Sequence, residues 1–258
     1  MLKNKVAVIY GAGGAIGGAV ARAFAAEGAM LFLSGRHLAP VEAVARDVAA
    51  AGAAAVDALD EQAVDTHLQS VINEAGRVDI SFNAVGIPNN EILGVPLADL
   101  GVELFTLPIL TYARSYFLTA RHAARHMVPN RSGVIMTVTA LHSRTGIALV
   151  GGYGPAMAAK EALTRDLSAE LAPHGIRVVG LRPQAVPETR TIKEAFEPRA
   201  KASGMTWEQW QEFLAGRTHA RRLMTLEEIA NVAVLMASEK ASGMTGTIVN
   251  LTMGSLDD

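Results

Sequence analysis

The chain has 258 residues, half of them apolar and 5% aromatic, with a formal net charge of -2. This length suffices for one α/β domain with a substantial core, and the small charge gives no reason to expect nucleic acid or an anionic membrane as a partner. The absence of cysteine excludes disulfides, thiolate catalysis and cysteine-ligated metals. No apolar run reaches the roughly 18 residues of a membrane-spanning helix. A strand begins almost at the first residue, so we expect a cytoplasmic protein without a signal peptide.

Strand-like and helix-like segments alternate along the chain, which is typical of a parallel sheet with helices on both faces. The predicted strands are residues 5–10, 30–33, 54–58, 79–83, 133–139, 176–181 and 247–251. The predicted helices are one that follows the first strand and ends near residue 27, capped by Gly28, and then residues 40–50, 61–75, 108–127 and 153–171. The pattern predicts a single domain, residues 1–258, with a doubly wound, seven-stranded Rossmann-type sheet.

The segment 184–222 departs from this alternation. It contains an isolated helical stretch, residues 206–214, whose Trp207, Trp210 and Phe213 fall on roughly one face. These aromatic residues either pack on the body of the protein or form a mobile lid over an apolar or acyl substrate.

The turn after the first strand is rich in glycine and opens a helix. Glycines let the backbone approach a pyrophosphate, and the helix N-terminus behind them supplies N–H donors and a favourable dipole. The turn does not match the Gly-x-Gly-x-x-Gly pattern, because Ile16 stands where the third glycine should be. Taken alone the signal is weak, since glycine-rich turns also serve plain packing.

The same turn resembles the Gly-x-x-x-Gly-x-Gly spacing of the short-chain dehydrogenase/reductase superfamily, with Gly11 and Gly17 in place and Ala15 as a small substitute. Asp57 matches an aspartate that this superfamily places beside the adenine ring, residues 83–86 are similar to its Asn-Asn-Ala-Gly, and residues 221–246 resemble its closing helix and Thr-Gly turn. The resemblance covers essentially the whole chain. It implies an oxidoreductase, a homotetramer or homodimer, and these cofactor-binding residues: Gly11, Gly13, Gly14, Ile16, Gly17, Arg36, Asp57, Ala58, Asn83, Gly86 and Lys160.

The residues after the second strand bear on which dinucleotide is bound. An NAD enzyme needs an acidic residue near this position for the ribose 2'-hydroxyl, and that carboxylate would repel a 2'-phosphate. Here Gly35 takes the acidic position, and Arg36 offers a guanidinium suited to phosphate. We therefore expect NADP(H) in preference to NAD(H), the alternative being that Arg36 is a solvated loop residue.

The catalytic residues match the superfamily only in part. Its usual tetrad is Asn, Ser, Tyr and Lys, the last two spaced Tyr-x-x-x-Lys. Tyr153 is in place, but the serine position falls on Ala140, the lysine position on Met157, and the asparagine position on Tyr112 or Thr111.

A lysine occurs seven residues after the tyrosine. Tyr153 and Lys160 are spaced Tyr-x6-Lys, which resembles the enoyl-acyl-carrier-protein reductases, a divergent branch of the superfamily. Seven residues advance a helix by about 700°, so both side chains share a face. We expect Lys160 to reach the nicotinamide ribose and to lower the pKa of Tyr153, although it could also be a solvated helix residue.

Three functions follow from this pattern. The first is NADP-dependent reduction of a C=C bond conjugated to a carbonyl, in an enoyl-thioester-like substrate, with Tyr153 and Lys160 as catalytic residues. The second is a carbonyl or alcohol oxidoreductase whose rebuilt site uses Tyr112, His142 or Ser143. The third is a catalytically degenerate NADP-binding scaffold. We expect no metal, because the histidine pair His122 and His126 has no evident third ligand.

Overall fold

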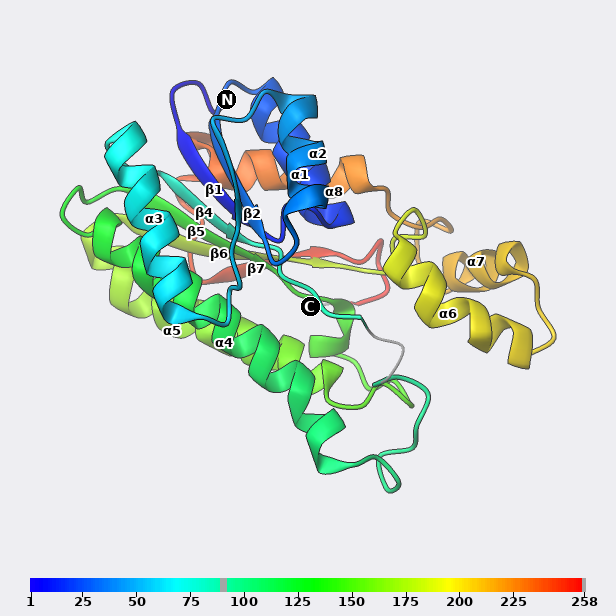
Figure 1. Cartoon of the computed structure of the whole chain (residues 1–258). Coiled ribbons are helices and arrows are strands. Elements are labelled where there is room, and N and C mark those ends of the chain that lie inside the picture. The colour runs from blue at the N-terminus through cyan, green and yellow to red at the C-terminus, as the bar shows by residue number, and fades with distance from the viewer. Residues whose placement is uncertain (89–91, 257–258) are drawn as a thin grey trace.

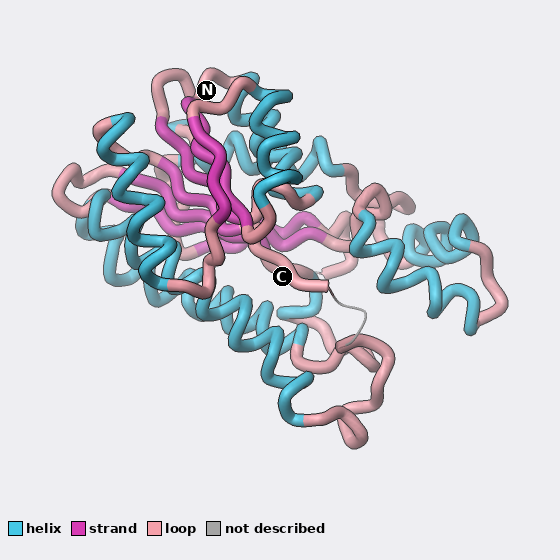
Figure 2. The backbone as a smooth tube through the Cα atoms, in the orientation of Figure 1, coloured by secondary structure: helices cyan, strands magenta, loops and turns pink. Residues whose placement is uncertain are grey.

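The computed structural model describes residues 1–88 and 92–256. Its centre is one parallel sheet of seven strands in the order β3-β2-β1-β4-β5-β6-β7 (Figure 2). The strands are β1 (Val6–Tyr10), β2 (Met30–Gly35), β3 (Gly52–Ala55), β4 (Ile80–Asn83), β5 (Gly133–Val138), β6 (Ile176–Pro183) and β7 (Thr247–Leu251). The strand order reverses between β1 and β4, and ligands of open α/β sheets bind outside the carboxyl ends of the strands at such a point. The predicted doubly wound fold is confirmed.

Helices cover both faces of the sheet (Figure 1). One face carries α1 (Ala15–Ala26), α2 (Leu38–Val48) and α8 (Leu226–Ala237); the other carries α3 (Glu61–Ala75), α4 (Val102–Met127) and α5 (Tyr153–Leu171). Each face has its own apolar core, and strand residues alternate between the two, as Val8 and Ile9 do on β1.

The long helix α4 begins earlier than the sequence predicts. The sequence pattern predicts a start at Pro108. In the structure the helix begins at Val102 after Gly101 and continues through Pro108. The additional turn carries exposed apolar side chains, Val102 at 70% and Leu107 at 43% exposure, which hide the amphipathic pattern from sequence analysis.

Two further helices form an arm at the carboxyl edge of the sheet. Helix α6 (Arg190–Ala202), which the sequence did not predict, packs against α7 (Trp207–Gly216), and the pair projects from the body (Figure 1). A capping box of Thr206 and Gln209 starts α7 one residue after the predicted start. No helix among the described residues is long and apolar enough to cross a membrane.

Candidate active site

The turn between β1 and α1 forms a cradle at the carboxyl edge. Gly11 has φ +80, and a Cβ there would lie 2.6 Å from the Ala84 carbonyl oxygen, so both backbone strain and space require glycine. A Cβ on Gly17 would collide with the Gly11 carbonyl oxygen. Gly14 precedes α1, and no side chain caps the helix N-terminus. The first N–H groups of α1 are therefore available to an anion.

The other residues expected to bind the cofactor at this turn are Gly13, Gly14 and Ile16, and they differ in exposure and packing. Gly13 and Gly14 are exposed and Ile16 is partly buried. A Cβ on Gly13 would lie 2.9 Å from the Cβ of Pro40, at the start of α2. The turn is thus closely packed on α2 and open toward the carboxyl edge.

The residues expected around the adenosine follow β2 and β3. The Arg36 side chain is exposed directly after β2. Asp57 is exposed too and accepts a hydrogen bond from the Leu59 backbone N–H at 2.9 Å, whereas Ala58 is buried. Arg36 and Asp57 thus come from neighbouring strands and face solvent at the same edge as the cradle.

Asn83 and Gly86 differ in accessibility. The side chain of Asn83 is 1% exposed and donates to Thr119 Oγ1 at 3.1 Å, and its Oδ1 has no hydrogen-bond partner among the described residues. Gly86 is exposed with no heavy atom near its missing side chain. Asn83 therefore ties β4 to α4 in this conformation, and Gly86 leaves open space at the edge.

Tyr153 begins helix α5 and lies between two other rings. The Tyr112 ring meets it edge-on at 5.7 Å between centroids, and the His142 ring does so at 5.1 Å. The Tyr112 hydroxyl accepts a long hydrogen bond from the Ile87 N–H, 3.4 Å. The three residues that the sequence offered as catalytic or auxiliary groups are therefore brought together from α4, α5 and the loop after β5.

The electrostatics of this group favour neutral forms. Burial, and secondarily the charge of Tyr112, raises the pKa of Tyr153 well above its usual range. Burial also raises the pKa of Tyr112 to about 12. Burial, assisted by the Arg199 charge, lowers the pKa of His142 to about 4. The expectation that Lys160 lowers the pKa of Tyr153 is therefore wrong for this conformation, because desolvation of the phenolate dominates.

Lys160 lies inside the protein. Its side chain has no exposed surface, and Nζ donates to the Val138 carbonyl oxygen at 2.8 Å. Nζ also lies 5.6 Å from the centre of the Tyr112 ring and 5.7 Å from that of Tyr116. The alternative of a solvated helix residue is thus wrong, and in this conformation the ammonium group presents no surface to a ligand.

The positions of the missing serine and lysine are apolar. Ala140 and Met157 pack with Tyr112 and Ala156 in one small cluster that Tyr153 adjoins. Ser143, a hydroxyl that could replace the serine, lies 2.5 Å from Glu161 Oε1 and 2.9 Å from the Ala140 carbonyl oxygen as a donor. Tyr153 thus borders an apolar cluster at the two positions where the superfamily pattern has a serine and a lysine.

The aromatic residues of the arm pack mainly on one another. The Trp210 ring lies 5.4 Å from Phe213 and 6.3 Å from Phe196 of α6, and Trp207 is partly buried. Arg199 of α6 donates to the Leu149 carbonyl oxygen at 2.5 Å. This bond links the arm to the loop that precedes Tyr153.

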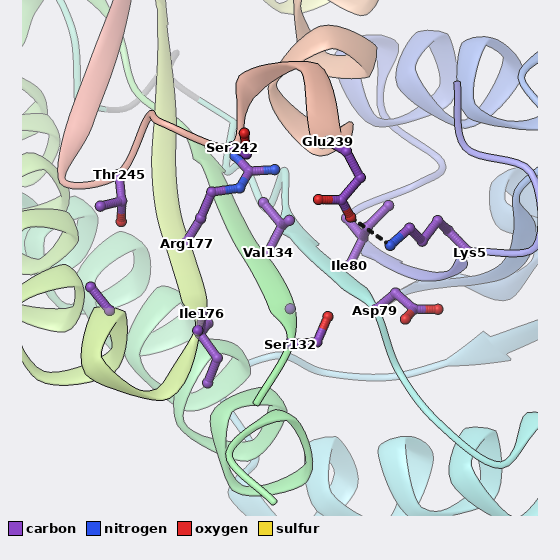
Figure 3. Close-up of a pocket in the computed structure, with 14 residues that line it drawn as sticks. Lys5, Asp79, Ile80, Ser132, Val134, Ile176, Arg177, Glu239, Ser242 and Thr245 are labelled. Atoms are coloured by element: carbon purple, nitrogen blue, oxygen red, sulfur yellow. Dashed lines mark hydrogen bonds and ion pairs between the residues drawn. The ribbon is translucent and has the colours of Figure 1, made fainter. Parts of the chain in front are cut away.

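A cavity of about 260 Å³ lies at the opposite edge of the sheet, at the starts of β4, β5 and β6 (Figure 3). Its charged groups already have partners: Lys5 pairs with Glu239 at 2.8 Å, and Arg177 donates to the Met236 and Ser238 carbonyl oxygens. Because ligands of such sheets bind at the carboxyl ends, we do not place the active site there. No group of three or more metal-ligating side chains occurs in residues 1–88 and 92–256.

The sequence profile of the family described as Enoyl-(Acyl carrier protein) reductase matches residues 11–255. The chain belongs to the short-chain dehydrogenase/reductase superfamily. The expectation drawn from the resemblance is thereby confirmed, and the chain is an oxidoreductase of this superfamily.

Relatives of this superfamily member differ in what they act on. The chain is 30% identical to the uncharacterized oxidoreductase YxjF of Bacillus subtilis, over 98% of each chain. It is 27% identical to 7alpha-hydroxysteroid dehydrogenase of Escherichia coli, over all of this chain and 96% of that one. The crystal structure of 3-ketoacyl-(acyl-carrier-protein) reductase from Brucella melitensis, complexed with NADH, is 26% identical with a TM-score of 0.85, covering 99% of each chain.

Proposed function

We propose that this short-chain dehydrogenase/reductase is an NADP-dependent enzyme that reduces a C=C bond conjugated to a carbonyl in a small apolar or acyl substrate. The proposal depends on one observation above all. Tyr153 adjoins an apolar cluster where the superfamily pattern has a serine and a lysine, so it acts as a single donor.

The cradle fits a dinucleotide. Glycine is required at Gly11 and Gly17 by the close approach of backbone, and the N-terminus of α1 is uncapped and has no acidic residue in its first turn. These are the properties that a pyrophosphate needs. When bound, NADPH supplies the hydride. We assign its phosphates to Gly11, Gly13, Gly14, Ile16 and Gly17, and its adenosine and nicotinamide ends to Arg36, Asp57, Ala58 and Gly86.

The preference for NADP in this proposal comes from Arg36. Its side chain is exposed at the end of β2 and no carboxylate stands at Gly35. A guanidinium recognises phosphate bidentately, whereas a carboxylate would recognise a free 2'-hydroxyl.

Tyr153 has the properties of a hydrogen-bond donor. Its raised pKa keeps the phenol protonated across the physiological range. Addition of hydride to the β-carbon of an enoyl group generates an enolate, and a phenol directed at its oxygen stabilises the developing charge. The proton for the α-carbon then comes from Tyr153 or from water.

The apolar cluster argues against ketone reduction. Ketone reduction passes the Tyr153 proton to an alkoxide in every turnover, so the phenol must be reprotonated through a relay. Enoyl reduction needs no such relay when water protonates the α-carbon. Ala140 and Met157 cannot take part in one, and Lys160 is bonded to the Val138 carbonyl beneath Tyr112. In this proposal Lys160 packs against the Tyr112 ring, which in turn contacts Tyr153. Its ammonium group would meet a ribose only by leaving the Val138 carbonyl oxygen.

Carbonyl reduction is the second candidate, and His142 favours it. Its ring lies against Tyr153, and its Nδ1 has no hydrogen-bond partner among the described residues. A neutral imidazole there could return a proton to the phenol. Under this reading His142→Phe removes turnover of ketones. Under the first reading the phenylalanine ring still packs against Tyr153 and keeps it in place, so enoyl reduction is largely unchanged.

The test is NADPH oxidation with crotonyl-CoA and, separately, with a panel of small ketones and aldehydes. Consumption with crotonyl-CoA and not with the panel supports the first function, and the converse result supports the second. Tight NADPH binding without turnover on either set would show a degenerate scaffold.

The arm, the assembly and the location complete the proposal. We assign residues 184–222 as a lid over the substrate, supported by the α6–α7 pair at the carboxyl edge (Figure 1). We propose a homotetramer or homodimer in the cytoplasm, in keeping with exposed Leu110 and Phe117 on α4. Light scattering on the purified protein measures the assembly, and cell fractionation the location.

A further inference from the structure

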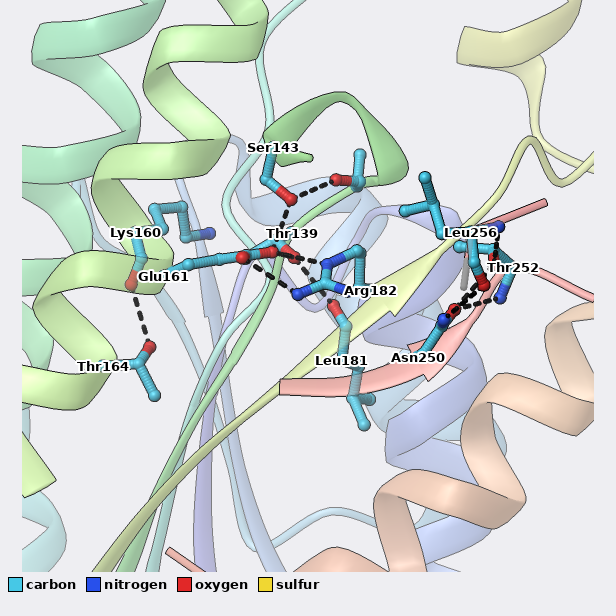
Figure 4. A network of polar contacts seen from close by, with 11 residues as sticks. Thr139, Ser143, Lys160, Glu161, Thr164, Leu181, Arg182, Asn250, Thr252 and Leu256 are labelled. Carbon is cyan, nitrogen blue, oxygen red and sulfur yellow. Dashed lines mark hydrogen bonds and ion pairs between the residues drawn. The ribbon is translucent and has the colours of Figure 1, made fainter. Parts of the chain in front are cut away.

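A buried polar network lies directly beneath the loop that contacts Tyr153 (Figure 4). Glu161 on α5 is 2% exposed, as is Arg182 on β6. The guanidinium donates to both carboxylate oxygens, from Nε to Oε1 at 2.8 Å and from Nη2 to Oε2 at 3.0 Å. Thr139 Oγ1 donates to Oε1 at 3.1 Å, and Ser143 Oγ to the same oxygen at 2.5 Å.

The four residues named in this network come from different parts of the fold. Thr139 follows β5 and Arg182 lies near the end of β6, so both belong to the rigid sheet. Ser143 ends the short 3-10 helix Leu141–Ser143, the loop that carries His142. The carboxylate therefore joins the loop to the sheet.

The loop packs closely against α5, and among the described residues its hydrogen bond to that helix comes from the Ser143 side chain. Its backbone bonds are local, from Ser143 N–H to the Ala140 carbonyl at 3.0 Å and from Arg144 N–H to Leu141 at 3.1 Å. The Ser143 side chain is the loop's polar contact to α5. A charge-assisted hydrogen bond of this length is stronger than a neutral one, so it contributes much of what determines the position of the His142 ring.

Stability alone is a weak explanation for the pair. Replacing a buried ion pair by apolar residues of similar volume is often neutral or stabilising, whereas removing one partner is costly. A pair that also accepts hydrogen bonds from a strand and an active-site loop has a positional role that apolar residues could not fulfil.

We propose that Glu161, paired with Arg182, is a positioning residue that holds the Leu141–Ser143 loop through Ser143 and thereby keeps His142 against Tyr153. Ser143 was a candidate to replace the lost catalytic groups or to contact substrate; its hydroxyl instead lies 2.5 Å from Glu161 Oε1 and 2.9 Å from the Ala140 carbonyl oxygen. Only the kinetic part of the test below rests on the proposed function.

The principal test is a ¹H–¹⁵N NMR titration of His142 between pH 8 and 5, with the signal assigned by its loss in His142→Gln. In the native protein the ring stays neutral over this range, because burial and Arg199 of α6 keep its pKa near 4; Tyr153 and Tyr112 are the other titratable groups beside it. In Ser143→Ala the released ring should titrate within the range, at least one pH unit higher.

Thr139→Val is the matched control, since it removes a hydroxyl from the same carboxylate oxygen without touching the loop. It should leave the His142 signal unchanged, and Ser143→Thr should restore native behaviour. The double variant Glu161→Met/Arg182→Met removes both charges together and should free His142 as Ser143→Ala does. Adding Ser143→Ala to the double variant should then change the His142 titration no further.

With NADPH and crotonyl-CoA, Ser143→Ala should lower kcat at least tenfold and leave the NADPH Kd within twofold. A His142 titration in Ser143→Ala identical to the native one overturns the proposal, whatever the kinetics. A shifted titration in a protein that is inactive on crotonyl-CoA would retain the positioning role and refute only the proposed reaction.

Discussion

Lys160 should make the free energy of unfolding of this protein rise with pH, and replacement of Lys160 by methionine should remove this dependence. The lysine is fully buried and its polar contact is the Val138 carbonyl oxygen. Desolvation by burial lowers its pKa from 10.5 to about 7. In the unfolded chain the same amine is solvated and takes its ordinary value.

The sign follows from proton binding. Between pH 7 and 10.5 the unfolded state holds a proton on Lys160 that the folded state has released, so the free energy of unfolding rises with pH in that window. Below pH 7 the charged amine is buried and its full cost applies. At 1.36 kcal/mol per pKa unit, the lowering of the Lys160 pKa from 10.5 to about 7 corresponds to a destabilisation of the folded state on the order of 5 kcal/mol.

Lys160→Met keeps much of the side-chain volume without the charge. It also leaves the Val138 carbonyl without its donor, which offsets the gain by about 1 kcal/mol. At pH 6.5 the variant should therefore be more stable than the native protein by roughly 3–4 kcal/mol, and this advantage should shrink by about 3 kcal/mol by pH 9.5.

Urea unfolding followed by circular dichroism at one-unit pH intervals measures both quantities, and an unchanged m-value shows that the two proteins unfold alike. Lys3→Met, at an exposed lysine, is the control and should leave the pH dependence as it is. Parallel pH profiles for the native protein and Lys160→Met would refute the reasoning.

Three further predictions concern the cofactor and the arm. Arg36→Ala should weaken NADPH binding roughly 10- to 100-fold, the loss of a charge-assisted contact, and leave NADH binding unchanged; equal losses for both, measured by fluorescence titration, would contradict the NADP assignment. Gly17→Ala should abolish detectable binding of either dinucleotide, because a Cβ collides with the Gly11 carbonyl; native affinity would exclude this turn as the cradle. Trp207→Ala should raise KM for crotonyl-CoA at least fivefold with the NADPH Kd unchanged, and an unaltered KM would argue against a lid.

The sheet was largely predictable because parallel strands buried on both faces are short apolar runs bounded by turns. Residues 247–251 match β7 as predicted. The prediction was less accurate at the edge strand β3, which spans Gly52–Ala55 where we expected 54–58. Alanines there carry no alternating pattern, so nothing in the sequence fixes the register.

The glycine turn that we propose as the cofactor cradle was predictable as a tight turn, since glycines at Gly11 and Gly17 are required by backbone geometry that a spacing pattern records. The surroundings of Tyr153 were not. A spacing of seven residues puts Lys160 on the same helix face as Tyr153, but it cannot tell that the ammonium group turns to the backbone of β5.

Glu161 and Arg182 were missed as well, although one signal was present. Arg182 is a charged residue that directly follows an apolar run and stands between Leu181 and Pro183, and a buried charge needs a partner. The sequence does not name that partner, because Glu161 reaches it only once α5 packs on the sheet.

In the proposed reaction the Tyr153 phenol stabilises the substrate oxygen during NADPH-dependent reduction. The most direct measurement compares the native protein with Tyr153→Phe for NADPH oxidation by crotonyl-CoA, together with the NADPH Kd of each. We predict that kcat falls by a factor of 10²–10⁴ while the Kd stays within twofold. Turnover of crotonyl-CoA by Tyr153→Phe at the native rate would contradict the mechanism.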